Sequence, residues 1–233
     1  MLRYAVLGTI GLIAGSASAQ QSPPQTETPA ATSSATPAPP AKAVVSMEEP
    51  LPGDRWTYEV RDEITGTISA TRANVVTEVT PKEISVRFKI VGTQNGGMNV
   101  YDRSWNLTAS NPWKYAPHDG TGIVTPLAIG KTWSLQSNDI NTANGAIGKR
   151  SGTSKVVGQE TVTTRAGTFE TFKIESIYSI RGVNDPTRKT DIKSETWYAP
   201  AIDHWVKRVF TSRVDNHLRV SNTLELVEYG RKQ

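Results

Sequence analysis

From residue 54 onward, apolar and polar residues alternate with a period of two, and this pattern constrains the fold more than any other feature. Trp56, Tyr58 and Val60 alternate with charged or polar neighbours, and segment 83–90 repeats the pattern. Successive side chains of a β-strand point to opposite faces, so such segments are typical of half-buried strands in an antiparallel sheet. No segment combines a helical repeat of apolar residues with capping residues. The sequence therefore predicts an all-β fold.

Roughly ten or eleven runs of this kind follow one another, separated by turn residues such as Asn95-Gly96-Gly97 and Asn184-Asp185-Pro186. The longest runs have about 13 residues, which favours strong curvature over a compact sandwich of short strands. We therefore expect a single antiparallel, strongly curved sheet or open β-barrel of about ten strands, with a β-sandwich as the alternative. The predicted strands cover residues 54–62, 67–80, 83–93, 97–108, 121–126, 131–138, 150–163, 168–181, 189–198, 203–214 and 217–229.

The first 46 residues differ in composition from the rest of the chain. Residues 1–19 have the features of a secretory signal peptide: Arg3, an apolar stretch over 4–14, and small residues before a cleavage site at Ala19. The apolar stretch is far shorter than the about 20 residues that span a bilayer, so we expect cleavage and no membrane-spanning segment. Residues 20–46, rich in Pro, Ala and Thr, are expected to be a disordered tail. Residues 47–233 then form a single all-β domain.

The supply of reactive side chains is small. The chain has no Cys and three His. Without Cys it has no disulfide, no Cys-ligated zinc, no thiol nucleophile and no lipid-modified N-terminal Cys. Three scattered His are few for a His-rich metal site, so we expect neither a metal nor a cofactor. The formal net charge of +4 is too small for a broad basic surface, so nucleic acid is not an expected partner.

Aromatic side chains are the most informative candidates for a binding site. Large rings inside a curved sheet either fill the core or line a ligand cavity, and Trp56, Trp133 and Trp205 favour the core. Segment 111–120 is different, because it is rich in turn-forming residues, and rings exposed in such loops often serve binding. The candidate ligand-binding residues are Trp105, Trp113, Tyr115, His118 and Trp197.

Acid–base chemistry is conceivable at His118-Asp119 and at Asp203-His204. Adjacent residues in a loop need not face each other, however, and the mature chain has no Gly-x-Ser-x-Gly motif to supply a nucleophile. Both histidines are therefore interpreted as surface residues with satisfied hydrogen bonds. We expect no catalytic residue and no enzymatic activity, with a hydrolase as a minor alternative.

Three segments together resemble the bacterial DUF3108 and related TapB-like periplasmic families. They are segment 126–133 with Gly130-Lys131-Thr132-Trp133, segment 165–174 with Ala166-Gly167-Thr168-Phe169, and segment 195–208 with Trp197-Tyr198-Ala199-Pro200. The resemblance covers roughly residues 53–229. Where such relatives often carry Gly after the Trp-Tyr-Ala-Pro turn, this chain has Asp203-His204. The resemblance implies an exported all-β protein of a Gram-negative bacterium, periplasmic or secreted, and it implies no established chemistry.

These expectations leave two function classes open. The first is a non-enzymatic periplasmic binding or envelope-maintenance protein, whose curved sheet holds an apolar or amphipathic small molecule or an extended segment of a partner. The second is a structural interaction module that joins an envelope or surface assembly through an exposed strand edge. A cavity lined by Trp and Tyr would favour the first class, whereas a filled interior with an open edge strand would favour the second.

Overall fold

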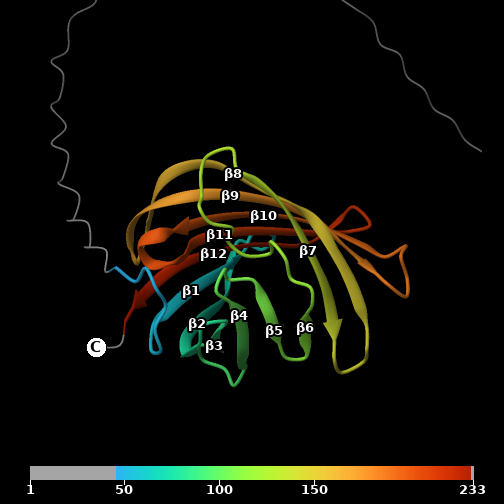
Figure 1. Cartoon of the computed structure of the whole chain (residues 1–233), viewed down its shortest axis with the longest axis horizontal. Coiled ribbons are helices and arrows are strands. Elements are labelled where there is room, and N and C mark those ends of the chain that lie inside the picture. The colour runs from blue at the N-terminus through green and yellow to red at the C-terminus, as the bar shows by residue number, and fades with distance from the viewer. Residues whose placement is uncertain (1–45, 232–233) are drawn as a thin grey trace, which may run out of the picture. The chain divides into compact units, whose positions relative to one another are not determined.

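The alternation of apolar and polar residues is accommodated by a sheet that closes on itself. The computed structural model describes residues 46–231, which form a closed antiparallel barrel of twelve strands (Figure 1). The all-β barrel class is thus confirmed, with more strands than the expected ten or so. The predicted signal peptide and, except for Ser46, the predicted tail lie outside the described residues. Within residues 46–231, no helix combines the length and apolar character needed to cross a membrane.

The strands are β1 (Arg55–Asp62), β2 (Thr67–Val79), β3 (Glu83–Ile90), β4 (Gly96–Asp102), β5 (Leu107–Ser110), β6 (Trp113–Tyr115), β7 (Thr132–Asn141), β8 (Ile147–Thr164), β9 (Gly167–Gly182), β10 (Lys189–Ala199), β11 (His204–Val214) and β12 (His217–Gly230). A single 3-10 turn, η1 (Pro200–Ile202), connects β10 to β11. Pro200 ends β10, as the sequence predicts.

Each strand pairs with its neighbours in the chain, and the first strand pairs with the last. The β1–β12 pairing runs from Arg55↔Gly230 to Asp62↔Asn222. Closure removes the free edges that an open sheet would expose to other chains. Where β7 extends past the short β6, the preceding loop covers it: the Gln136 amide donates to the Asp119 carbonyl at 2.8 Å. The barrel therefore offers little strand edge to a partner.

The predicted strand over 97–108 is divided in the structure. Trp105 has a φ of 58°, in the left-handed region, and separates β4 from β5. The Asp102 carboxylate causes this break, since its Oδ1 accepts the amides of Ser104 and Asn106, both at 2.9 Å. Such local side-chain bonds offer the backbone an alternative to the ladder. The turn adds a strand that the alternating pattern does not reveal.

Two further predictions for this region are wrong. Trp113–Tyr115 is not a loop but strand β6, and segment 121–126 is a loop rather than a strand. The loop is held by β4–β5 turn groups: the Asn106 Oδ1 accepts the Gly122 amide, and the Ser104 carbonyl accepts the Ile123 amide at 2.7 Å. Because these two amides bond to groups of the β4–β5 turn, they are not available for pairing with a neighbouring strand.

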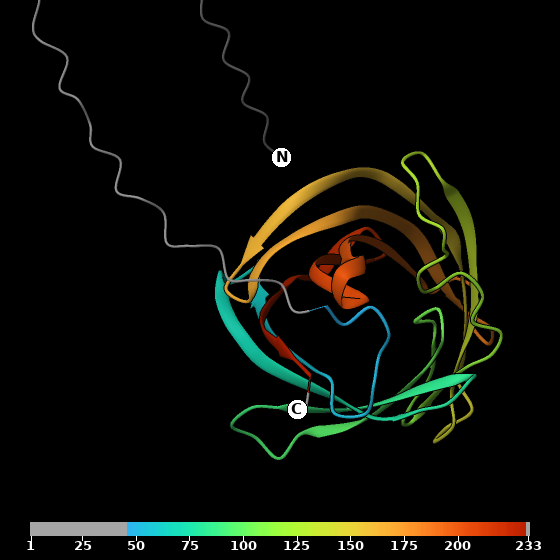
Figure 2. The same cartoon turned by 60° about the vertical axis from the view of Figure 1, so that its left-hand side comes forward.

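One end of the barrel is filled by the main hydrophobic core. In Figure 2, η1 lies within the ring of strands at this end. Ile202 of η1 and Met47 are fully buried, and the Met47 amide donates to the Ala201 carbonyl at 2.8 Å. Both belong to the same cluster as Trp56, which confirms the prediction that Trp56 fills the core. The segment before β1 and the η1 turn together close this end.

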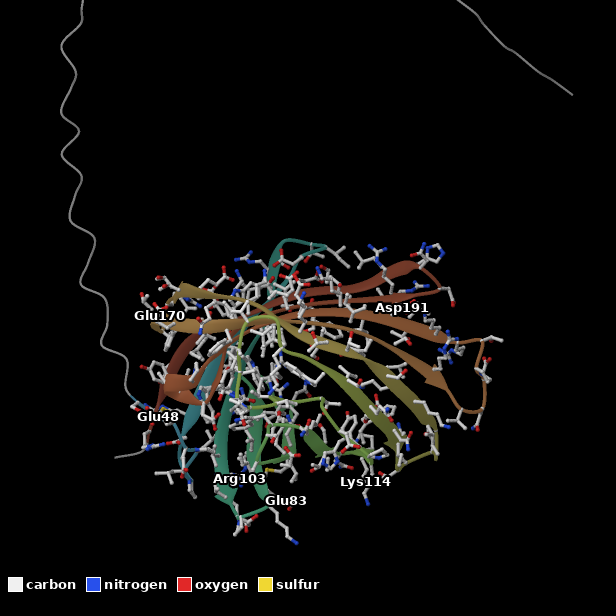
Figure 3. The ribbon with its side chains drawn as sticks, turned by 45° about the horizontal axis from the view of Figure 1, so that its top comes forward. Glu48, Glu83, Arg103, Lys114, Glu170 and Asp191 are labelled. Atoms are coloured by element: carbon white, nitrogen blue, oxygen red, sulfur yellow. The ribbon has the colours of Figure 1, made fainter. Side chains whose placement is uncertain are left out.

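Charged side chains on the outer surface point into solvent. Glu83, Lys114 and Glu170 are exposed and project away from the barrel (Figure 3). Charges on the inner face are the exception, and they define the site described next.

Candidate ligand-binding site

The barrel contains a cavity of about 310 Å³, at the lower end of the about 300–1,000 Å³ typical of small-molecule sites. Every strand contributes at least one side chain to its wall, because alternate residues point inward. The loop between β6 and β7 adds Thr121, Gly122 and Ile123. The other lining residues are Tyr58, Arg72, Asn74, Val86, Asn99, Tyr101, Trp105, Leu107, Tyr115, Leu135, Ser137, Arg150, Ile174, Ser176, Tyr178, Ser194, Thr196, His204, Trp205, Arg208, Phe210 and Leu224.

Aromatic rings pack around His204 between the core and the cavity. The ring centroid of His204 lies 3.7 Å from that of Trp205, 4.4 Å from Trp56 and 4.7 Å from Trp105. The Tyr58 hydroxyl donates to the Trp205 carbonyl at 2.8 Å, and this bond links β1 to β11 beside the rings. Trp205 was expected to fill the core, and it packs against the core but also lines the cavity.

The prediction that His204 is a surface residue is wrong, because its side chain is only 4% exposed. Burial lowers the pKa of the His204 imidazole well below its usual range, and the charges of Arg208 and Arg72 lower it further. Desolvation and nearby cations both disfavour the charged form. A neutral imidazole enclosed by rings is part of the aromatic packing, and neighbouring Asp203 bonds elsewhere, accepting from the Tyr198 hydroxyl at 2.5 Å.

This burial predicts acid sensitivity. Because the His204 pKa is lower in the folded than in the unfolded state, unfolding takes up a proton, and stability is lost as pH falls below about 6.5. We expect chemical denaturation between pH 7 and 5 to show a slope approaching about 1.4 kcal/mol per pH unit from this residue. His204→Phe should flatten the curve, whereas replacing the exposed His217 with Phe should not. Equal slopes in wild type and His204→Phe would contradict this assignment.

The charged side chains that line the cavity are three arginines, Arg72, Arg150 and Arg208, with no Asp or Glu among the lining residues. Arg150 forms an ion pair with the buried Asp139, with an NH2–Oδ2 distance of 2.6 Å. The Ser137 hydroxyl donates to the other oxygen of Asp139 at 2.8 Å. The inner wall therefore combines apolar surface with a local excess of positive charge.

Arg72 and Arg208 are held by neutral groups instead. The Arg208 Nε donates to Thr196 Oγ1 at 3.1 Å, and its guanidinium carbon lies 4.0 Å from the Trp205 ring centroid. In the same manner, the Arg72 Nε donates to Asn74 Oδ1 at 3.1 Å, and the guanidinium lies 4.2 Å from the Phe88 centroid. Each guanidinium is thus positioned by one hydrogen bond and one aromatic face.

The structure brings together only part of the predicted binding set. Trp105 and Tyr115 line the cavity. Tyr115 also lines a second, more open hollow of about 530 Å³, together with the 38% exposed Trp113 and apolar residues such as Ile180. Ligand binding by these residues stays a prediction, now narrowed to Trp105 and Tyr115 at the cavity and Trp113 at the hollow.

His118 and Trp197 line neither of these two spaces. The His118 Nε2 lies 3.5 Å from Asp102 Oδ2 beside the β4–β5 turn. Trp197 belongs to the main core, and its indole Nε1 donates to the Glu160 carboxylate. The Lys207 Nζ lies 5.2 Å from the centroid of the Trp197 ring. On β10 the cavity takes Ser194 and Thr196, so the alternation excludes Trp197 from it.

The sequence analysis missed the arginines. The signal was present in β11, where Arg208 and Phe210 are two residues apart and so share a face. In β2, Arg72 and Asn74 likewise share a face with the buried Val76. A charged residue in phase with buried ones is the pattern that marks an inward-facing cation.

The comparisons with known proteins concern the fold. No curated protein matches the chain. A solved structure of a candidate lipoprotein from Parabacteroides distasonis has a TM-score of 0.53 at 14% identity, over 79% of this chain and 99% of that one. An exported protein with a YmcC-like fold from Bacteroides fragilis has a TM-score of 0.44 at 16% identity, over 81% and 100% of the two chains. The hypothetical lipoprotein YmcC from Escherichia coli has a TM-score of 0.48 at 10% identity, over 78% and 87%.

A family comparison concerns the second half of the barrel. Residues 132–208, from the start of β7 to the middle of β11, match the model of the DUF3108-like family. This segment contains two of the three motifs on which the resemblance rests, and the Trp133 that ends the first. The resemblance to the DUF3108-like family is thereby confirmed over residues 132–208.

Proposed function

We propose that this chain is a non-enzymatic binding protein of the bacterial envelope that holds an apolar or amphipathic small molecule inside its barrel. The observation that carries the proposal is the cavity of about 310 Å³, enclosed by a closed barrel and lined by aromatic and aliphatic side chains. Burial of apolar ligand surface against this wall supplies the affinity. The gain is about 25 cal/mol for each Å² removed from water, before the costs of association are subtracted. The lining polar groups fix orientation.

Export and an envelope location are part of the same proposal. They rest on the signal-like residues 1–19 and on the likeness in fold to the candidate lipoprotein from Parabacteroides distasonis. The non-enzymatic part rests on the two histidines considered for catalysis. His204 is enclosed by rings, and His118 lies beside Asp102 and is not among the residues that line the cavity. The mature chain has no Gly-x-Ser-x-Gly motif that would place a serine nucleophile beside either histidine.

Filling the cavity should abolish binding while the barrel still forms. Ser194 points into the cavity from β10, so we expect Ser194→Phe to occupy part of it and to weaken a neutral probe, N-phenyl-1-naphthylamine, at least about tenfold. Probe fluorescence measures the affinity, and circular dichroism confirms the fold. Lys193→Phe places the same ring on the adjacent outward position, where the lysine is half exposed, and should leave affinity unchanged.

The natural ligand is accessible by native mass spectrometry of protein purified from its own envelope fraction. We expect a small molecule to co-purify with the wild type and to be missing from Ser194→Phe. A wild type that carries no small molecule and does not bind the neutral probe would overturn the proposed function. So would equal probe affinities of the wild type and Ser194→Phe.

A further inference from the structure

Two cationic side chains of the cavity have no ionic partner. Neither Arg72 nor Arg208 forms an ion pair with any residue in the described range 46–231. Arg150 of the same cavity has Asp139, so the fold does neutralise an inward-facing arginine elsewhere. Both side chains are half-buried, and a charge taken partly out of water is costly unless it is paired.

The two guanidinium groups are arranged to receive a ligand. In each, the wall of the barrel takes the Nε hydrogen and an aromatic ring covers a face of the plane. Within residues 46–231, the terminal nitrogens of Arg72 and Arg208 make no hydrogen bond to protein. The terminal pair of nitrogens is the edge that binds both oxygens of a carboxylate or a phosphate.

Both arginines act on the same part of the cavity. Burial lowers the pKa of Arg208, and the charge of Arg72 is among the further groups that lower it. Both cations also act on the pKa values of Tyr58 and His204. The repulsion between these two half-buried cations is relieved by an anion placed between them.

Two polar ring atoms beside the cavity have no partner among the described residues of the protein. Trp205 Nε1 and His204 Nδ1 are buried without a hydrogen-bond partner in the part of the chain that the structure describes, and both residues line the cavity. Buried polar atoms without a partner are rare in folded proteins. An indole N–H can only donate, and that of Trp205 has no acceptor within residues 46–231.

We propose that the ligand is an amphipathic anion, with a carboxylate or phosphate head bound between Arg72 and Arg208 and an apolar chain against the aromatic and aliphatic wall. The inference rests on the proposed function and names the chemical class of its ligand. Anion binding completes the charge pairing that the fold leaves open at these arginines. A carboxylate or phosphate head group has enough oxygens to accept hydrogen bonds from more than one guanidinium group.

The test uses the full mature chain and compounds that share a twelve-carbon chain but differ in head group. Dodecanoate, dodecyl phosphate, dodecanol and dodecylamine compete with N-phenyl-1-naphthylamine for the cavity. We expect the anions to bind at least about tenfold more tightly than the alcohol and the amine to bind most weakly. The ratio of dodecanoate to dodecyl phosphate affinity identifies the preferred head group, and either preference supports the proposal.

Variants separate charge recognition from folding. Arg72→Gln and Arg208→Gln should each weaken the preferred anion at least about tenfold and leave dodecanol and the neutral probe unchanged, which also shows that the cavity is intact. Arg208→Lys keeps the charge but not the planar guanidinium, so its anion affinity should lie between those of the wild type and Arg208→Gln. The matched control is Arg87→Gln, on the exposed face of β3.

The two proposals fail differently. If dodecanol binds as tightly as both anions, or if Arg72→Gln and Arg208→Gln leave anion affinity at the wild-type value, the anion inference is wrong, while the proposed function stands on the neutral probe. If the neutral probe does not bind the wild type, the proposed function itself fails.

Discussion

Replacing Arg231 with Ala is expected to lower the free energy of unfolding by about 3 kcal/mol. Asp54 is 0% exposed, and Arg231 donates a hydrogen bond to each of its carboxylate oxygens. The Nε–Oδ1 distance is 2.9 Å and the NH2–Oδ2 distance is 3.0 Å. Without the arginine, the Asp54 carboxylate keeps, within residues 46–231, the Leu51 amide as its hydrogen-bond donor, at 2.8 Å. An unpaired buried charge is costly, and the value lies at the low end of the range because Arg231 is partly exposed.

Guanidinium or thermal denaturation measures this effect, with an expected fall in melting temperature of about 6–12 °C. The control is Arg55→Ala, which removes the exposed Arg55–Glu228 pair and should cost less than about 1 kcal/mol. Adding Asp54→Asn to Arg231→Ala should recover part of the loss, because it removes the unpaired charge. If Arg231→Ala and Arg55→Ala have the same effect, the burial of Asp54 is not what makes this pair matter.

The position of this pair explains why it should matter so much. Asp54 directly precedes β1, and Arg231 directly follows β12, the two strands whose pairing closes the barrel. Arg231 also donates to the Glu49 carbonyl at 2.5 Å, in the segment that covers the filled end. Loss of the pair therefore loosens both the closure and the end of the core that contains Met47.

Local alternation predicts most strands but not the closure. Runs expected over 189–198 and 217–229 correspond to β10 (Lys189–Ala199) and β12 (His217–Gly230). The β1–β12 pairing joins the two ends of the domain, and no local pattern carries that information. The break at Trp105 was also hidden, because it depends on which amides the Asp102 carboxylate accepts. An alternating pattern cannot show a competing side-chain bond.

The site was less predictable than the fold for a physical reason. Alternation tells which residues share a face, but a face that contains Arg72 and Asn74 looks like the solvent side of a strand. Only the closed barrel places these side chains around a cavity. Trp197 was misleading in the opposite sense, because a large ring in a curved sheet can either fill the core or line a cavity. Its position on β10 is out of phase with the cavity-lining Thr196, and it belongs to the core.

Gly152→Ala is expected to lower the free energy of unfolding by about 3 kcal/mol, at the upper end of the usual cost of overpacking. Gly152 of β8 faces Tyr178 of β9 across the longest hairpin. A Cβ at this position would lie 2.2 Å from the Ile177 carbonyl oxygen and 2.4 Å from the Tyr178 Cβ. These atoms belong to the backbone or its first side-chain bond, so no rotamer change relieves the overlap, and the two strands must separate.

The same strand supplies the matched control for Gly152→Ala. A Cβ on Gly158 would meet nothing within 4 Å, so Gly158→Ala should change stability by less than about 1 kcal/mol. Gly152→Ala should also weaken the neutral probe, because Tyr178 lines the cavity and lies 5.2 Å, centroid to guanidinium carbon, from Arg150. Denaturation and probe titration on both variants decide the matter. If Gly152→Ala is as stable as Gly158→Ala, the close approach of β8 and β9 does not set the shape of this wall.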